Sequence, residues 1–246
     1  MHPTGSHPGL LVSIEGVNGV GKDYLLQHAR PRLTRPSRTI AEFSARMRST
    51  GTPGLSQQVL HAMARAADGD HFLRGGAPRS ETLLLLAVKT HDYESALPHL
   101  LDGATVVEGR SLHSTAVYQS LILEPADPLP TARRLLGLGA RWRPLPDTTV
   151  LVTDDLDAAL ARAEQRDDKI FTLEERTLHR RAEELFREFA DGDDRIRVLD
   201  RRLLAPGEAA ALMAQWIDRA AARKAAGAAA VPRPRGASDA DEQVSS

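Results

Sequence analysis

Residues 10–29 read LLVSIEGVNGVGKDYLLQHA, and this stretch decides the fold class of the chain. The run from Leu10 to Glu15 is apolar, contains β-branched residues and ends at a glycine, which is typical of a buried strand. A glycine-rich turn follows, and the pattern from Lys22 to Ala29 predicts a helix that Pro31 would stop. A strand, a glycine-rich loop and a helix in direct succession are typical of phosphate-binding proteins.

The loop itself has the spacing G-x-x-x-x-G-K over residues 16–22. Glycines allow successive backbone N–H groups to turn inward around an anion, and the helix N-terminus adds partial positive charge. The lysine side chain can span the β- and γ-phosphates. We therefore expect ATP to bind here. The expected cofactor-binding residues are Gly16, Val17, Asn18, Gly19, Val20, Gly21, Lys22, Asp23 and Tyr24.

The position after the lysine departs from this pattern. Serine or threonine usually stands there, and its hydroxyl binds Mg²⁺. This chain has Asp23, whose carboxylate is a hard oxygen ligand that can bind Mg²⁺ directly. Aspartate is also a favourable residue at the start of a helix, so a purely structural role stays open.

The rest of the chain alternates between short apolar runs and longer helical patterns. Strands are expected over residues 38–43, 104–108, 148–153 and 196–199, and helices over residues 55–67, 79–101, 111–123, 131–138, 155–166, 174–190 and 206–223. This alternation predicts an α/β fold, with a five-stranded parallel sheet and helices on both faces. Ligands bind beyond the carboxyl ends of such strands, so functional residues are expected in the loops after Glu15, Phe43, Glu108 and Thr153, and three of these four loops carry suggestive residues.

One domain is expected over residues 10–223. Residues 1–9 are expected to form a disordered leader, and residues 224–246, rich in alanine, proline and serine, a disordered tail. Four arginines, at positions 133, 134, 141 and 143, are expected on a solvated helix face.

Composition restricts the function further. The chain has 246 residues, of which 41% are hydrophobic, a net charge of −1 and no cysteine. These values favour a folded, cytoplasmic protein and exclude disulfides and cysteine-based metal sites. The near-zero net charge does not favour nucleic acid as a partner, and the absence of a long apolar run argues against a membrane span.

Three segments together resemble the thymidylate kinase family of P-loop nucleoside monophosphate kinases, over roughly residues 10–220. The first is the stretch quoted above. The second, ETLLLLAVKTHDYESALPHLLDGATVVEGRSLHSTAVYQ, is similar to the family's long helix, third strand and D-R-Y-x-x-S-x-x-A-Y-Q signature. The third, TTVLVTDDLDAALARAEQRDD, resembles the strand and helix that lead into an arginine-bearing lid.

This resemblance implies a P-loop kinase-type fold with a short lid at about residues 162–173, and ATP-dependent phosphoryl transfer to a nucleoside monophosphate with Mg²⁺. It also implies a homodimer. The catalytic residues by resemblance are Lys22 and Arg110, which would hold the donor and acceptor phosphates, and the lid arginines Arg162 and Arg166. Ser114, Tyr118 and Gln119 match the signature and are expected at the acceptor.

The departures from the family concentrate in the acceptor half. Gly109 occupies the position of the signature's aspartate, and Lys89 and Leu85 replace an arginine and a ring that would stack on thymine. The family's R-E-P-G-G-T loop reads MRSTGT over residues 47–52. We expect Glu108 to position Mg²⁺ or the attacking oxygen, with a buried salt bridge as the alternative. The expected acceptor-site residues are Leu85, Lys89, Glu108, Ser114, Tyr118 and Gln119, and the expected metal ligands are Asp23 and Glu108.

An altered acceptor site follows from these departures, and two alternatives to dTMP kinase activity stay open. The acceptor could be a modified nucleotide or a small hydroxyl compound in a specialised pathway. Alternatively, the chain could be a kinase-like nucleotide-binding protein that has lost catalysis, which Asp23 and Gly109 favour.

Overall fold

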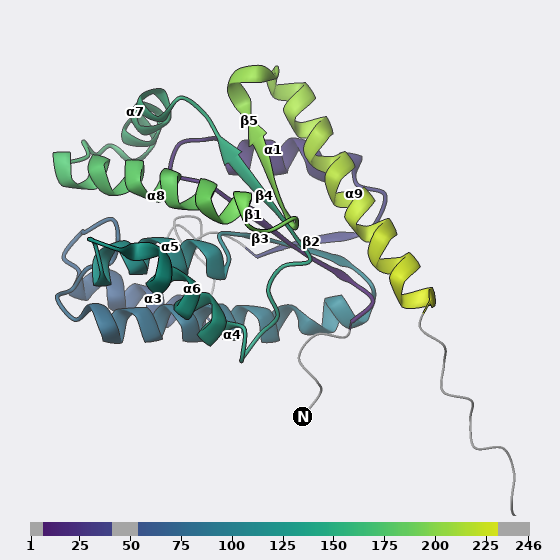
Figure 1. Ribbon diagram of the computed structural model, residues 1–246, viewed down its shortest axis with the longest axis horizontal. Coiled ribbons are helices and arrows are strands. Elements are labelled where there is room, and N and C mark those ends of the chain that lie inside the picture. The colour runs from purple at the N-terminus through teal and green to yellow at the C-terminus, as the bar shows by residue number, and fades with distance from the viewer. Residues whose placement is uncertain (1–6, 41–53, 231–246) are drawn as a thin grey trace, which may run out of the picture.

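The computed structural model describes residues 7–40 and 54–230, which form a three-layer α/β arrangement (Figure 1). Its sheet has the strand order β2-β3-β1-β4-β5, and all neighbouring strands are parallel. The prediction of a five-stranded parallel sheet with surrounding helices is therefore confirmed. The strands are β1 (Leu10–Glu15), β2 (Ser37–Ile40), β3 (Thr105–Gly109), β4 (Thr148–Thr153) and β5 (Ile196–Asp200).

Helices cover both faces of the sheet. Helices α1 and α9 pack together on one face, while α4 and α8 contact the other and α5 packs against both of them (Figure 1). The helical elements are α1 (Lys22–Ala29), η1 (Arg30–Arg32), α3 (Leu55–Ala66), α4 (Pro78–Leu101), α5 (Leu112–Leu123), α6 (Pro128–Gly139), α7 (Leu156–Asp167), α8 (Leu173–Asp191), η2 (Arg201–Leu203) and α9 (Pro206–Ala230).

The folded unit extends beyond residues 10–223 at both ends. Helix α9 continues to Ala230, and Lys224 on it forms an ion pair with Asp147 at 2.7 Å. At the other end His7 is buried, and the Gly9 N–H donates to the carbonyl oxygen of Leu100 at 2.9 Å. Residues 7–9 and 224–230 are therefore part of the described fold, and the division of the remaining ends into a leader and a tail stays a prediction.

The alternation of side chains along β1 explains how the sheet is held on both faces. Val12 belongs to an apolar cluster that includes Met213 of α9. Leu11, the preceding residue, belongs to a separate cluster with Leu100 of α4. Because neighbouring residues of a strand point to opposite faces, this six-residue strand contributes to the packing of both helical layers.

A fully buried ion pair involves Glu108 of β3. The guanidinium of Arg143 donates to both carboxylate oxygens of Glu108, at 2.7 and 2.8 Å, and lies 5.4 Å from the centre of the Tyr93 ring. The expected solvated position was wrong for Arg143, which has no exposed surface. A charge can be buried in this way because Glu108 neutralises it in bidentate geometry.

We expect the Glu108→Ala substitution to lower the free energy of unfolding by about 3–5 kcal/mol, because it leaves the Arg143 guanidinium buried without a partner. Urea unfolding followed by circular dichroism measures this change. The control is Glu183→Ala, which removes the partly exposed pair with Arg187 and should cost less than about 1 kcal/mol. The double substitution Glu108→Leu, Arg143→Met should recover most of the loss. Equal losses for Glu108→Ala and its control would contradict this account.

Candidate functional site

Residues 16–22 lie between β1 and α1, as the sequence pattern predicts. Gly16, Gly19 and Gly21 have φ angles of 131°, 78° and 84°, in the region that favours glycine. A Cβ at Gly19 would lie 1.7 Å from the carbonyl oxygen of Ala159, so no side chain fits there. The Nζ of Lys22 is buried and donates to the carbonyl oxygen of Val17 at 3.0 Å. The lysine side chain thus folds back over the loop, at the place where phosphate would bind.

Two arginines hold the outer side of this loop. The Nε of Arg162 donates to the carbonyl of Gly19 at 3.0 Å, and Arg201 donates to the carbonyl of Val20 at 3.0 Å. Both guanidinium groups also contact Asp154, at 2.5 and 3.3 Å. Sequence reasoning anticipated Arg162 but missed Arg201 and Asp154. Their signal was available, since each directly follows a strand end, where parallel sheets place their ligand sites.

The other expected lid arginine is placed differently. Arg166 lies at the end of α7 and pairs with Asp167 at 2.6 Å. The expected lid, residues 162–173, comprises the end of α7 and its connection to α8. Arg162 contacts the phosphate loop through its hydrogen bond to the Gly19 carbonyl, whereas Arg166 forms its ion pair at the end of α7.

A buried carboxylate connects the phosphate loop to the start of α5. Glu15, the last residue of β1, accepts hydrogen bonds from the hydroxyls of Ser13 and Ser111 at 2.6 Å and of Ser114 at 2.5 Å, and from the Ser111 N–H at 2.7 Å. Burial alone would raise the pKa of Glu15, but nearby His113 and the serine hydrogen bonds outweigh it and lower the pKa. Glu15 is therefore a charged anchor, which sequence reasoning missed.

Arg110 lies directly beside this anchor. Its φ angle is 66°, a strained conformation for a non-glycine residue, and its N–H donates to the carbonyl of Ile14 at 3.1 Å. Its guanidinium bonds the side-chain oxygen of Asn18 and lies 5.6 Å from the centre of the Tyr118 ring. Lys89 donates to the Arg110 carbonyl. The structure thus brings Arg110, Lys89 and Tyr118 together beside the phosphate loop.

The remaining acceptor-site residues make contacts within the protein. The amide oxygen of Gln119 accepts from the Thr82 hydroxyl at 2.8 Å, and Leu85 packs in an apolar cluster of α3 and α4. The pairing of Glu108 with Arg143 favours the salt-bridge interpretation of Glu108 over metal binding. Residues 47–52, which align with the family's R-E-P-G-G-T loop, lie outside the described residues.

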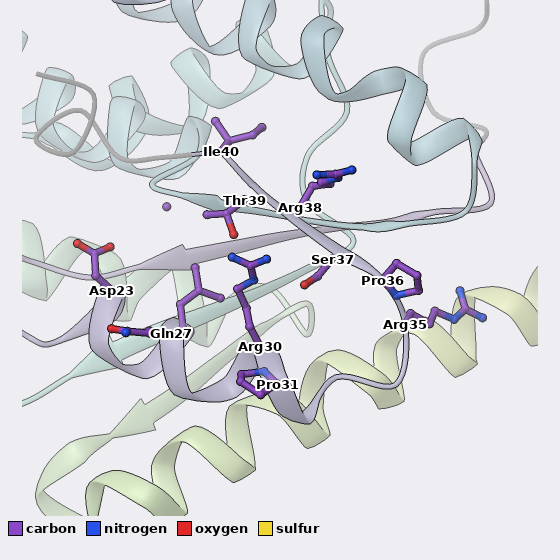
Figure 2. Close-up of a pocket in the computed structure, with 12 residues that line it drawn as sticks. Asp23, Gln27, Arg30, Pro31, Arg35, Pro36, Ser37, Arg38, Thr39 and Ile40 are labelled. Atoms are coloured by element: carbon purple, nitrogen blue, oxygen red, sulfur yellow. The ribbon is translucent and has the colours of Figure 1, made fainter. Parts of the chain in front are cut away.

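Two of the residues that depart from the family pattern, Asp23 and Gly109, line one cavity. Asp23 at the start of α1 and Gly109 at the end of β3 both border a cavity of about 790 Å³. Figure 2 shows Asp23 at one end of it and the side chain of Arg30, the first residue of η1, reaching toward Thr39 of β2. The carboxylate at position 23 and the missing side chain at position 109 thus shape the same space.

The donor set around the loop fits one kind of metal site. Over residues 7–40 and 54–230, no group of three or more histidine, aspartate or glutamate side chains is arranged to hold a metal. Mg²⁺ at phosphoryl-transfer sites is typically held by one or two carboxylates together with substrate phosphates. Asp23, next to the phosphate loop, fits that requirement.

Among the described helices, none combines the length and apolar character needed to cross a bilayer.

Comparison with known proteins agrees with this geometry. A family model described as thymidylate kinase matches residues 14–204. The thymidylate kinase of Bifidobacterium longum strain NCC 2705 is 32% identical over 196 residues, covering 78% of this chain and 89% of that protein. The thymidylate kinase of Chlamydia trachomatis serovar D is 30% identical over 205 residues, covering 81% and 94%.

A solved structure extends the similarity to the fold. Thymidylate kinase from Candida albicans superposes with a TM-score of 0.64 at 18% identity, covering 90% of this chain and 95% of that one. At this identity the likeness supports the architecture, while the family model and the sequence relatives establish the relationship. The chain therefore belongs to the thymidylate kinase family of phosphotransferases.

Proposed function

We propose that this chain transfers the γ-phosphoryl group of ATP to a nucleoside monophosphate, with dTMP, the acceptor that the relatives' name implies, as the first candidate. The observation that carries the proposal is the joining of Arg110 to the phosphate loop. Asn18 in the loop bonds the Arg110 guanidinium. Glu15 binds Ser111 and Ser114 at the start of α5, the helix that follows Arg110. A polyphosphate cradle and a cation suited to a second phosphate thus belong to one rigid unit.

The reaction needs positioning and charge neutralisation and no covalent intermediate. An oxygen of the acceptor phosphate attacks the γ-phosphorus, and the bond to the β–γ bridging oxygen breaks, with its electron pair leaving on ADP. Lys22 would exchange its hydrogen bond with Val17 for phosphate oxygens. Arg162 and Arg166 would stabilise the transferring group once the lid closes. Mg²⁺ would neutralise phosphate charge, held by phosphate oxygens and Asp23.

An altered acceptor preference belongs to the same proposal. Lys89 carries its charge on a single ammonium rather than on a planar fork, and that ammonium contacts the Arg110 carbonyl. Leu85 offers no ring and packs into an apolar cluster. These features support a preference among nucleoside monophosphates different from that implied by the family signature.

We expect Lys22→Ala to lower turnover by at least about 100- to 1000-fold, because it removes a cation that stabilises the transferring phosphoryl group. ADP release with ATP and Mg²⁺, measured across dTMP, dUMP, UMP, CMP, AMP and GMP, checks this. Lys224→Ala is the matched control, because it removes a lysine of α9 whose ammonium pairs with Asp147 at 2.7 Å. Full activity of Lys22→Ala would overturn the proposal. ATP binding without turnover of any acceptor in the unmodified chain would favour the non-catalytic alternative.

Asp23→Ser tests the metal assignment separately. A serine hydroxyl is the usual Mg²⁺ ligand at this position, so we expect the variant to keep or raise turnover at saturating Mg²⁺. The Mg²⁺ concentration at half-maximal rate should change, because a neutral ligand replaces a carboxylate. A variant with unchanged Mg²⁺ dependence would show that Asp23 has only a structural role.

A further inference from the structure

A cluster of aromatic and imidazole rings lies beside Arg110. The Phe72 ring centre is 5.5 Å from that of Tyr118 and 5.0 Å from that of His179, and Tyr118 and His179 are 6.0 Å apart. Three separate parts of the chain supply the rings. His71 and Phe72 lie between α3 and α4, and Tyr118 lies on α5. Phe171 lies just before α8, and His179 lies within that helix.

The members differ in exposure in a way that separates a core from a surface. Phe171 and His179 are buried, at 3% and 0% exposure, whereas Phe72 and Tyr118 are only half-buried. Phe72 and Tyr118 therefore each keep part of their surface accessible. Burying the rest of both rings would stabilise the complex with a ligand, because buried aromatic area contributes strongly to stability.

The half-buried pair is attached to the phosphate loop. The Asn18 side chain bonds both Arg110 and the ring of His71, the residue before Phe72. The Arg110 guanidinium in turn lies 5.6 Å from the Tyr118 ring centre. A cation suited to phosphate thus adjoins a half-buried aromatic pair. A nucleoside monophosphate has the matching arrangement, with a phosphate and a flat base joined by one sugar.

The segment that carries Phe72 is also held from the side of α8. Arg74 pairs with Asp70 at 2.7 Å and with Glu174 of α8, and its guanidinium lies 5.7 Å from the Phe72 ring centre. These ion pairs fix the backbone on either side of Phe72. A ring on a segment tied at both ends loses little entropy when a ligand stacks on it.

A buried polar atom lies within the same cluster. The Nδ1 of His179 is 3.3 Å from the Tyr118 hydroxyl, and its Nε2 has no hydrogen-bond partner in the described part of the chain. Burial and the nearby Arg110 lower the pKa of His179 to about 2, so the ring is neutral. A buried nitrogen without a hydrogen-bond partner costs free energy, so the packing of the cluster has to offset that cost.

We infer that Phe72 and Tyr118 form the surface on which the base of the acceptor nucleotide stacks. Leu85 on α4 stands where the family has a ring that stacks on the base. Phe72 then supplies that ring from the segment before α4. The inference rests on the proposed function, and it makes Phe72 a specificity-determining residue.

Phe72→Leu tests this directly. We expect the KM for the preferred acceptor to rise about 5- to 100-fold, with the KM for ATP and the kcat at saturating acceptor changed less than about twofold. Phe72→Trp, which keeps a flat ring, should retain tight acceptor binding. The matched control Phe189→Leu replaces a ring packed on the core near His113, and should lower the melting temperature without moving the acceptor KM.

A binding measurement separates this inference from the proposed function. In calorimetric titrations, Phe72→Leu should weaken binding of dTMP but leave binding of deoxyribose 5-phosphate, which lacks a base, unchanged. Binding of dTMP with this pattern but without turnover would support the stacking surface and count against the kinase activity. An unchanged acceptor affinity in Phe72→Leu, equal losses for both probes, or no nucleotide binding by the unmodified chain would overturn the inference.

Discussion

The absence of room for a side chain at Gly19 is the constraint on which the site depends. The loop crosses so close to α7 that a Cβ at Gly19 would lie 1.7 Å from the Ala159 carbonyl oxygen. A Cβ at Gly16 would likewise lie 2.3 Å from the carbonyl oxygen of Val152 on β4. Positive φ angles at Gly16, Gly19 and Gly21 are of the kind that lets successive backbone N–H groups turn inward around an anion. The anion cradle is therefore a property of the main chain, fixed by the packing of β4 and α7 against it.

The rest of the site is built outward from that loop by charged side chains. On one side Asp154 holds Arg162 and Arg201 against the loop carbonyls. On the other, Glu15 fixes the start of α5, and Asn18 joins Arg110 to the segment that carries Phe72. The two sides of the loop are thus linked through side-chain hydrogen bonds. This arrangement suits a reaction that depends mainly on positioning.

The strands, the loop and the order of the helices could be predicted because each has a local signal in glycine, proline and apolar spacing. What could not be predicted is long-range pairing. Arg143 lies in an arginine-rich stretch that suggests a solvated surface, and only the fold brings it to Glu108. Phe72 follows a glycine- and aspartate-rich turn with no motif, and becomes significant only beside Tyr118. The roles of the residues taken from the family resemblance stay predictions.

The most direct test of this account is calorimetric titration of ATP with Mg²⁺ into the full chain and its Gly19→Ala variant, with circular dichroism to verify the fold. Gly207→Ala serves as the matched control, because a Cβ there meets no atom within 4 Å. The account predicts saturable binding to the unmodified chain and the control, and none to folded Gly19→Ala. Equal affinity of Gly19→Ala for ATP, or no heat from the unmodified chain, would contradict a main-chain phosphate cradle.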